Sequence, residues 1–337
     1  MTTAPRWAIV VGGGGIALLG AMALGLALGP VSIGLRTILR ALWMHGGDTE
    51  SVIVLQLRLP RVVLAALSGG GLAVAGASFQ ALTRNPLADP AVLGVAGGAA
   101  FAVVSAEIAG FSRTPLGYLG LSTFAFAGAV VAAGLVFLIA RSDGVIPIQT
   151  LVLAGVIVGL FFSASITLLI SFVDFTRLGA INYWMMGNLA AVGLRPLGVL
   201  AAGLALGEGA LLLQARALNL LAVGEESALH GGVSVERLKR VVFLTASLIT
   251  GLVVAFAGPI GFVGLIVPHT VRLLLGPDHR IVFPASILGG GVFLVLADGL
   301  ARTVIQPAEL PIGVITAICG APFFIALLRR HPGGSAA

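Results

Sequence analysis

The chain is 337 residues long, and 58% of its residues are hydrophobic whereas 9% are charged. A soluble globular domain carries about 25% charged residues, so this composition and a mean hydropathy of +1.11 exclude a soluble protein. The net charge of +6 is spread over many short clusters rather than gathered on one face. We therefore expect no nucleic-acid partner.

Apolar segments lie between the charged clusters, and each is about long enough to cross a bilayer, which takes roughly 20 residues in a helix. Barrel strands would instead alternate polar and apolar residues over about ten positions. The expected spans run over about 7–29, 60–82, 91–110, 117–140, 149–172, 197–215, 241–257, 259–276, 281–301 and 311–328. We predict an all-α membrane protein with about ten transmembrane helices, in a single transmembrane domain covering residues 1–337.

The topology follows from parity and from the placement of basic residues. The segment after Arg6 could be a signal peptide, but its apolar run continues to Leu28, which is long for a signal core. Ten spans place both termini on one side, and a small majority of the basic residues is then cytoplasmic if the termini are. Omitting the proline-interrupted span at 259–276 would move Arg329 and Arg330 outside, against the positive-inside tendency. Both termini are therefore predicted to be cytoplasmic.

Three polar segments interrupt the apolar pattern. The first begins at Arg58-Leu59-Pro60-Arg61, passes through a glycine-rich span to Gln80, and ends in the stretch 84–90, which reads Arg-Asn-Pro-Leu-Ala-Asp-Pro. Small residues let helices approach closely, so packing alone would explain the glycines. Polar residues at both ends of one span favour an element of a translocation pathway.

The second segment, at about 214–240, is the only long stretch of mixed charge. Gly224 and Gly231-Gly232 divide it into short helical pieces. It is longer than a connection between two membrane helices needs to be. It is either a solvated connector or a docking surface for a cytoplasmic partner.

The third segment runs from Gly258 to His269 and continues to Glu309. Proline and glycine interrupt a span here, and backbone freed in this way is tolerated where it is buried in protein or lines a cavity. Asp298 and Glu309 lie near span ends, where a functional role and snorkelling to water are both open.

Together these segments resemble the FecCD-type permease family, the membrane subunits of binding-protein-dependent, ATP-driven importers for ferric siderophores, haem and vitamin B12. The resemblance covers nearly the whole chain, and its motifs stand in order and at the family's spacing. They are Arg58-Leu59-Pro60-Arg61, Arg84-Asn85-Pro86-Leu87-Ala88, Leu221-Ala222-Val223-Gly224-Glu225, Gly258 to His269, Asp278-His279-Arg280, Ala297-Asp298 and Glu309-Leu310-Pro311-Ile312-Gly313.

The resemblance implies a homodimer in the bacterial inner membrane with the pathway at the dimer interface, two ATP-binding subunits on the cytoplasmic side and a periplasmic substrate-binding protein. Gates at the pathway are implied for Asn85, Leu87, Ile148, Gln149 and Thr150. Coupling to the ATPase is implied for Leu221, Ala222, Gly224, Glu225, Glu226, Ala228, Gly231 and Gly232. Acidic side chains of the binding protein would dock on Arg58, Arg61 and Arg302. No catalytic residue, metal ligand or cofactor is implied.

The chain departs from the family pattern at two positions. Gly231 stands where relatives usually carry a leucine before Gly-Val, which leaves the end of the local helix open. Glu208 lies inside the sixth span, where an apolar residue is more usual. It either faces the pathway, pairs with Arg216 or reaches the cytoplasmic edge.

The chain cannot contain its own ATP motor. A P-loop needs a lysine directly after a glycine, and the only lysine, Lys239, lies between Leu238 and Arg240. Lys239 is expected to serve topology or docking, so that Lys239→Ala would leave transport nearly intact.

Two other classes of membrane protein fit less well. An ion-coupled secondary transporter would place ionisable residues near the bilayer midplane on broken helices, yet apart from Glu208 the acids lie near span ends or in loops. A haem-holding redox subunit would need axial ligands at depth, whereas the five histidines lie in loops or at span boundaries. Haem, a corrinoid and a ferric siderophore all remain open as the substrate.

Overall fold

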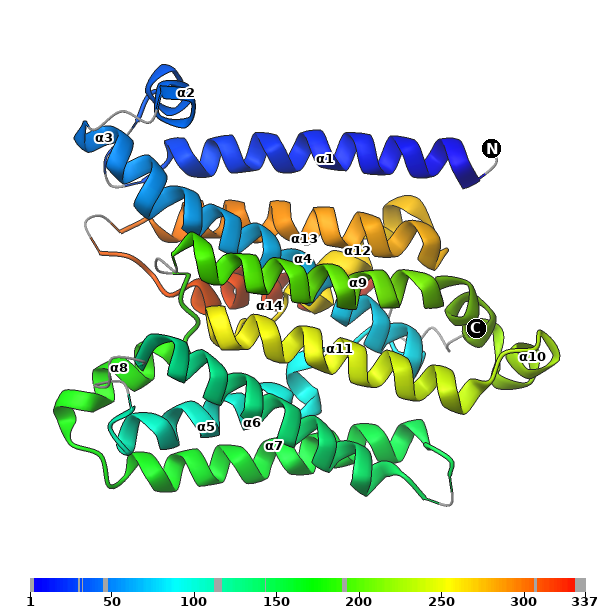
Figure 1. The fold of residues 1–337 in the computed structure, drawn as a ribbon. Coiled ribbons are helices and arrows are strands. Elements are labelled where there is room, and N and C mark those ends of the chain that lie inside the picture. The colour runs from blue at the N-terminus through cyan, green and yellow to red at the C-terminus, as the bar shows by residue number, and fades with distance from the viewer. Residues whose placement is uncertain are drawn as a thin grey trace.

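The computed structural model describes residues 3–29, 31, 33–44, 48–111, 117–142, 144–189, 193–305 and 308–330. These residues form long helices that run alongside one another in a bundle (Figure 1). The long helices are α1 (Thr3–Ala27), α4 (Leu59–Thr83), α5 (Val95–Ile108), α6 (Gly117–Ala140), α7 (Ile148–Ile170), α9 (Leu194–Val223), α11 (Val235–Ala257), α12 (Val263–Leu275), α13 (His279–Ala301) and α14 (Ile312–Arg330). The short elements are α2 (Leu35–Met44), α3 (Thr49–Val52), the π-helix η1 (Ile53–Arg58), the 3₁₀ helix η2 (Pro90–Leu93), α8 (Phe175–Met185) and α10 (Glu225–His230).

The bundle has two distinct ends. The short helices α2, α3 and α8 lie at one end, on the left of Figure 1, which we call the α2 end. Helix α10 projects at the opposite end, which we call the α10 end. The start of α1 and the end of α14 both lie toward the α10 end, as an even number of crossings requires.

Each of the ten predicted spans coincides with one of the ten long helices. Among the residues that the structure describes, seven helical segments are by length and composition able to cross a membrane, and α5, α12 and α14 are shorter apolar helices. One of the seven is a continuous helix from Thr49 to Thr83, formed by α3, η1 and α4. The predicted all-α, multi-pass membrane fold is confirmed.

The second polar segment is more regular than the sequence suggested. Helix α9 does not end near 215 but continues to Val223, and α11 already begins at Val235. The non-membrane insert predicted at about 214–240 is therefore largely the ends of two long helices, with only α10 and its flanking glycines between them. Helix α8, between α7 and α9, was not predicted.

Helix α4 is the buried centre of the bundle, and all of residues 68–82 are buried. It packs most extensively against α13. Gly69 of α4 faces Gly290 of α13 so closely that a Cβ on either glycine would overlap the carbonyl oxygen of the other. A Cβ on Gly76 would likewise overlap the carbonyl oxygen of Gly264 of α12. The glycines of the first polar segment thus serve close helix packing.

Helices α5, α6 and α7 form a second packed group, in which α5 contacts both α6 and α7. Gly98 of α5 and Gly128 of α6 make a close approach like that of Gly69 and Gly290. Helix α11 contacts α4 and α9 on one side and α5 and α6 on the other. It therefore joins the two groups.

A non-helical segment, 258–262, separates α11 from α12. Gly258 has φ +68°, and Phe262 has φ +70°, a left-handed conformation that is uncommon for a residue other than glycine. The buried carboxylate of Asp89 accepts a hydrogen bond from the Ala91 N–H at 2.7 Å and another from the Phe262 backbone. Asp89 thereby ties the segment after α4 to the start of α12.

Candidate functional sites

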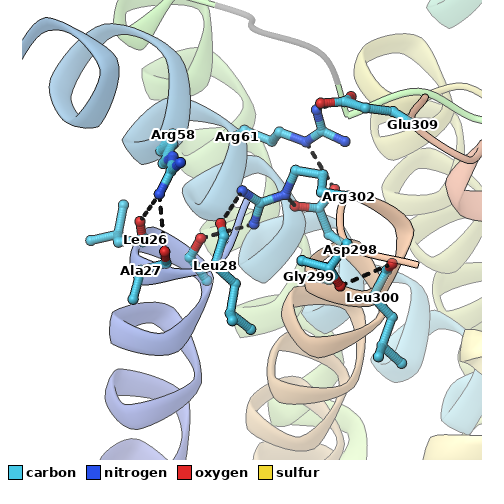
Figure 2. Close-up of polar contacts among 12 residues, drawn as sticks. Leu26, Ala27, Leu28, Arg58, Arg61, Asp298, Gly299, Leu300, Arg302 and Glu309 are labelled. Carbon is cyan, nitrogen blue, oxygen red and sulfur yellow. Dashed lines mark hydrogen bonds and ion pairs between the residues drawn. The ribbon is translucent and has the colours of Figure 1, made fainter. Parts of the chain in front are cut away.

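The three arginines of the predicted docking site lie at the α2 end, and all three have partners within the chain (Figure 2). Arg58 Nη1 donates to the carbonyl oxygens of Leu26 at 2.7 Å and Ala27 at 3.1 Å, and Arg58 Nη2 donates to the carbonyl of Val31. These carbonyls belong to the last turn of α1 and the residues after it, which intrahelical bonds leave unsatisfied. Arg58 thus caps α1 from a neighbouring helix.

Asp298 of α13 connects the other two arginines. Arg61 Nε lies 2.9 Å from Asp298 Oδ1, and Arg61 Nη1 lies 2.6 Å from Glu309 Oε2. Arg302 Nε lies 2.9 Å from Asp298 Oδ2, and its two terminal nitrogens donate to the carbonyls of Leu28 and Gly25 at 2.8 Å. The arginine cluster, defined as Arg58, Arg61, Asp298, Arg302 and Glu309, therefore joins α1, α4, α13 and the segment before α14.

The burial of this cluster bears on the docking prediction. Arg58 is 5% exposed and Arg302 is 3% exposed, so neither offers a free guanidinium to an acidic side chain of another protein. The use beyond topology that the sequence indicated for these arginines is internal: they hold four segments together. Asp298 and Glu309 are pairing partners rather than snorkelling acids. Docking on Arg58, Arg61 and Arg302 remains a prediction, and Arg61, with a side chain 13% exposed, is the most accessible of the three.

The predicted gate residues lie where α4 ends and where α7 begins. Arg84 caps α4 in a left-handed conformation, with φ 51°. The Asn85 side-chain oxygen then accepts the Leu87 N–H at 2.9 Å, which fixes a tight turn. Asn85 and Leu87 are exposed.

The second set of gate residues forms the first turn of α7. Gln149 and Thr150 are exposed, whereas Ile148 is half-buried and packs against the main apolar core. The structure thus presents both predicted gates on the surface of a single chain.

The predicted coupling segment is a compact turn–helix–turn between α9 and α11. Leu221 and Ala228 are buried and anchor it to the bundle, whereas Ala222 and Glu226 are exposed. Gly224 has φ +152°, in the region that favours glycine, and it allows the chain to turn from α9 into α10.

The end of α10 resolves the departure at Gly231. The Val233 N–H donates to the Ala228 carbonyl at 2.9 Å, and Gly232 has φ +77°. This is the glycine-terminated helix end that satisfies the last carbonyls. A Cβ at Gly231 would lie 2.9 Å from Cδ1 of Leu220, so a larger residue here requires that exposed side chain to move.

The burial of Lys239 is the structural feature least expected from the sequence. Lys239 is not a surface residue: it is 2% exposed. Its Nζ lies 3.1 Å from Glu225 Oε1 of α10 and 2.9 Å from Glu236 Oε1 of α11, and it donates to the Ile146 carbonyl at 3.2 Å. Removing Lys239 would leave two carboxylates and a carbonyl without their shared partner, which counts against the prediction that Lys239→Ala leaves transport nearly intact.

A second polar cluster at the α10 end was visible in the sequence only as separate motifs. Gln80 of α4 donates to the Gly264 carbonyl at 3.2 Å and accepts a hydrogen bond from Arg272 of α12. Asn219 of α9 donates to Asp278 at 2.6 Å and accepts from the His279 N–H at 2.9 Å. These bonds fix α4 to α12 and α9 to the start of α13, and Asn219 carried no sequence signal for this role.

Glu208 is half-buried in α9. Within the part of the chain that the structure describes, no ion pair joins it to Arg216. A position eight residues along a helix is about 12 Å away, which explains why, of the three alternatives, pairing with Arg216 does not occur.

Comparison with known proteins gives one consistent result. The sequence profile of the FecCD transport family matches residues 17–330. The cobalamin import system permease protein BtuC of Halobacterium salinarum is 44% identical, covering 84% of this chain and 74% of that protein. An uncharacterized ABC transporter permease protein of Bacillus subtilis, YvrB, is 40% identical over 92% of this chain and 91% of its own length.

The structural comparison agrees. A solved "metal-chelate type ABC transporter" in an inward-facing conformation is similar with a TM-score of 0.82 and 32% identity, over 96% of this chain and all of that one.

Proposed function

Because this chain belongs to the FecCD transport family, we propose that it forms, as a homodimer, the translocation pathway of a binding-protein-dependent importer for a metal chelate. The family consists of permease subunits of ABC transporters rather than enzymes, so ATP hydrolysis falls to a separate partner chain. The observation that carries the proposal is the match over residues 17–330 combined with a fold that superposes along nearly its full length.

The structure supports the division of roles between the two ends. The α10 end carries the acidic, partly exposed helix α10 and both predicted gates, which suits a cytoplasmic face that meets two ATP-binding subunits. The α2 end would then face the periplasm and the substrate-binding protein. The protein would then lie in the inner membrane of a bacterium, with both termini on the cytoplasmic side.

A pathway shared between two copies is supported by the exposure of the gates. Asn85, Leu87, Gln149 and Thr150 are exposed in the single chain. Helix α7, which starts at Ile148, also presents exposed large apolar residues along its length, such as Leu153, Leu160 and Phe161. A second copy packed near this helix would convert surface residues into the lining of a pathway.

The class of substrate is inferred from relatives with named cargo. Besides the cobalamin permease, a hemin transport permease of Yersinia pestis is 40% identical, and an Fe(3+)-citrate import permease of Bacillus subtilis is 38% identical. The three cargoes share a chelated metal ion. We therefore propose a corrinoid, haem or ferric chelate as the substrate.

The test is ATP-driven uptake by the assembled importer. The chain, purified in mild detergent from its own host, is expected to carry an ATP-binding subunit. Proteoliposomes containing this complex and the cognate binding protein are expected to accumulate cyanocobalamin, haemin or ferric citrate with ATP but not with a non-hydrolysable analogue. Uptake driven by an ion gradient in the absence of ATP would contradict the proposal and favour a secondary transporter.

A further inference from the structure

We propose that Lys239 is a positioning residue that transmits displacement of α10 to the first turn of α7, so that movement of a bound ATPase reaches Ile148, Gln149 and Thr150. This inference rests on the proposed function and adds the physical link between its coupling segment and one of its gates. The residues concerned are far apart in sequence, since Lys239 and Ile146 are separated by 93 positions.

The ammonium group of Lys239 is fully used. A lysine has three N–H donors, and Lys239 Nζ has three partners: Glu225 of α10, Glu236 of α11 and the carbonyl of Ile146. Each partner belongs to a different segment. One buried atom therefore joins the coupling helix, the helix that follows it and the connection between α6 and α7.

Glu236 adds a second link to the same connection. Its Oε2 accepts the Ile146 N–H at 2.7 Å while its Oε1 pairs with Lys239. Glu236 and Lys239 thus hold the peptide N–H and the carbonyl of Ile146. Ile146 is itself only 1% exposed. Only Pro147 separates this anchored residue from Ile148, the first residue of α7.

The connection is stiff enough to carry a displacement. Ser142 and Val145 exchange two backbone hydrogen bonds, of 3.1 and 2.9 Å, which close a tight turn. Pro147 fixes its own φ and lies at the N-cap of α7. The start of α7 therefore has little freedom to move independently of Lys239 and Glu236.

Burial distinguishes this cluster from an ordinary surface ion pair. Exposed pairs contribute about 0–1 kcal/mol, whereas Lys239 is buried and its two acids have side chains 40% and 30% exposed. Glu225 belongs to α10, which projects at the end of the bundle where the ATPase would bind (Figure 1). Lys239, which is buried, contacts both Glu225 and the Ile146 carbonyl, so a displacement of Glu225 reaches the connection before α7.

The experiment measures the response of the gate to ATP. Cys319, the only native cysteine, is replaced by serine and Gln149 by cysteine. The rate at which Gln149→Cys reacts with a thiol reagent is then compared with and without ATP in the reconstituted importer. ATP hydrolysis and substrate uptake are measured in parallel with Gln149 intact.

In Lys239→Met we expect the effect of ATP on the labelling rate to fall and the ATP consumed per substrate transported to rise by ~10-fold, a typical size for coupling between sites. Glu236→Gln, which keeps the shape of the side chain, should shift both readouts in the same direction by less. Lys239→Arg should restore part of the response, because it keeps the charge and the donors. Arg237→Met is the matched control: Arg237 is an exposed cation on the same helix, and wild-type behaviour is expected.

The proposal can be tested even if Lys239→Met does not fold. If Lys239→Met is not recovered as a monodisperse complex, Glu236→Gln and Lys239→Arg carry the test. An ATP response of Gln149→Cys that is unchanged in every recovered variant would overturn the transmission role, while absence of ATP-driven uptake in the wild type would instead overturn the proposed function.

Discussion

Asp298 is fully buried and pairs with Arg61 at 2.9 Å, although 237 positions separate the two residues in the chain. Burying a charged group is costly unless its partners are in place. Asp298 has two, Arg61 and Arg302, on opposite oxygens. The arginine cluster therefore acts as one unit at the α2 end.

The first prediction follows from this arrangement. Asp298→Ala leaves two arginine side chains of low exposure without their shared carboxylate, and breaking a buried pair costs about 3–5 kcal/mol. We expect a clear fall in the unfolding midpoint of the purified protein in detergent. Glu309→Ala is the control, because the Glu309 side chain is 32% exposed, and it should lower the midpoint far less. Equal losses in the two variants would contradict the central place of Asp298.

Gly290 tests the close approach of α13 to α4. Gly290→Ala forces a methyl group against the Gly69 carbonyl and the Ala73 side chain, and overpacking of this kind costs about 1–3 kcal/mol. We expect loss of folded protein on heating at a lower temperature. Gly134→Ala, on a helix surface with nothing within 4 Å of the added carbon, should be neutral or slightly stabilising, since alanine is the better helix former.

Topology is tested by thiol labelling in intact cells. In a Cys319→Ser background, Ser171→Cys after α7 should react with an impermeant reagent, and Ser234→Cys before α11 should be shielded. Both positions are exposed in the single chain and lie at opposite ends of the bundle. Labelling of Ser234→Cys and not Ser171→Cys would reverse the proposed orientation.

Association with the binding protein is expected to depend on the accessible cations at the α2 end. Arg36 and Arg40 of α2 are exposed, whereas Arg58 and Arg302 are buried. Arg36→Gln with Arg40→Gln should weaken association with the binding protein at low salt by ~3-fold, in keeping with the small energies of exposed pairs. The difference in affinity between this variant and the wild type should vanish at high salt, because the Debye screening length falls to about 3 Å at 1 M. Arg302→Gln should instead reduce the yield of folded protein, and a purely docking defect in that variant would contradict its structural role.

Local features of this protein were predictable because their causes are local. The ten apolar segments follow from composition over windows of about 20 residues, and the bounds of α10 follow from Gly224 and Gly231-Gly232, which set the backbone on either side. Family membership was also reached from the sequence, because its motifs are short and ordered.

Contacts between distant segments were not predictable from one sequence. Nothing near Lys239 indicates that its partners include the Ile146 carbonyl, and nothing near Arg58 indicates the end of α1. The sequence likewise does not indicate that Arg58 meets the unsatisfied carbonyls at that helix end. Helix α8 was missed because it is too short to span a membrane, although Asp174 at its N-cap is a residue type that is typical of helix starts.

The sequence separation within the arginine cluster has a consequence for biogenesis. Arg61 emerges from the ribosome early, with α4, but its partners come late: Asp298 follows eight of the ten long helices, and Glu309 follows nine. During that interval the Arg61 guanidinium must be kept in water or against lipid headgroups. The α2 end therefore becomes complete only when the last part of the chain has been inserted, and a truncated chain would display an unpaired arginine to the quality-control machinery of the membrane.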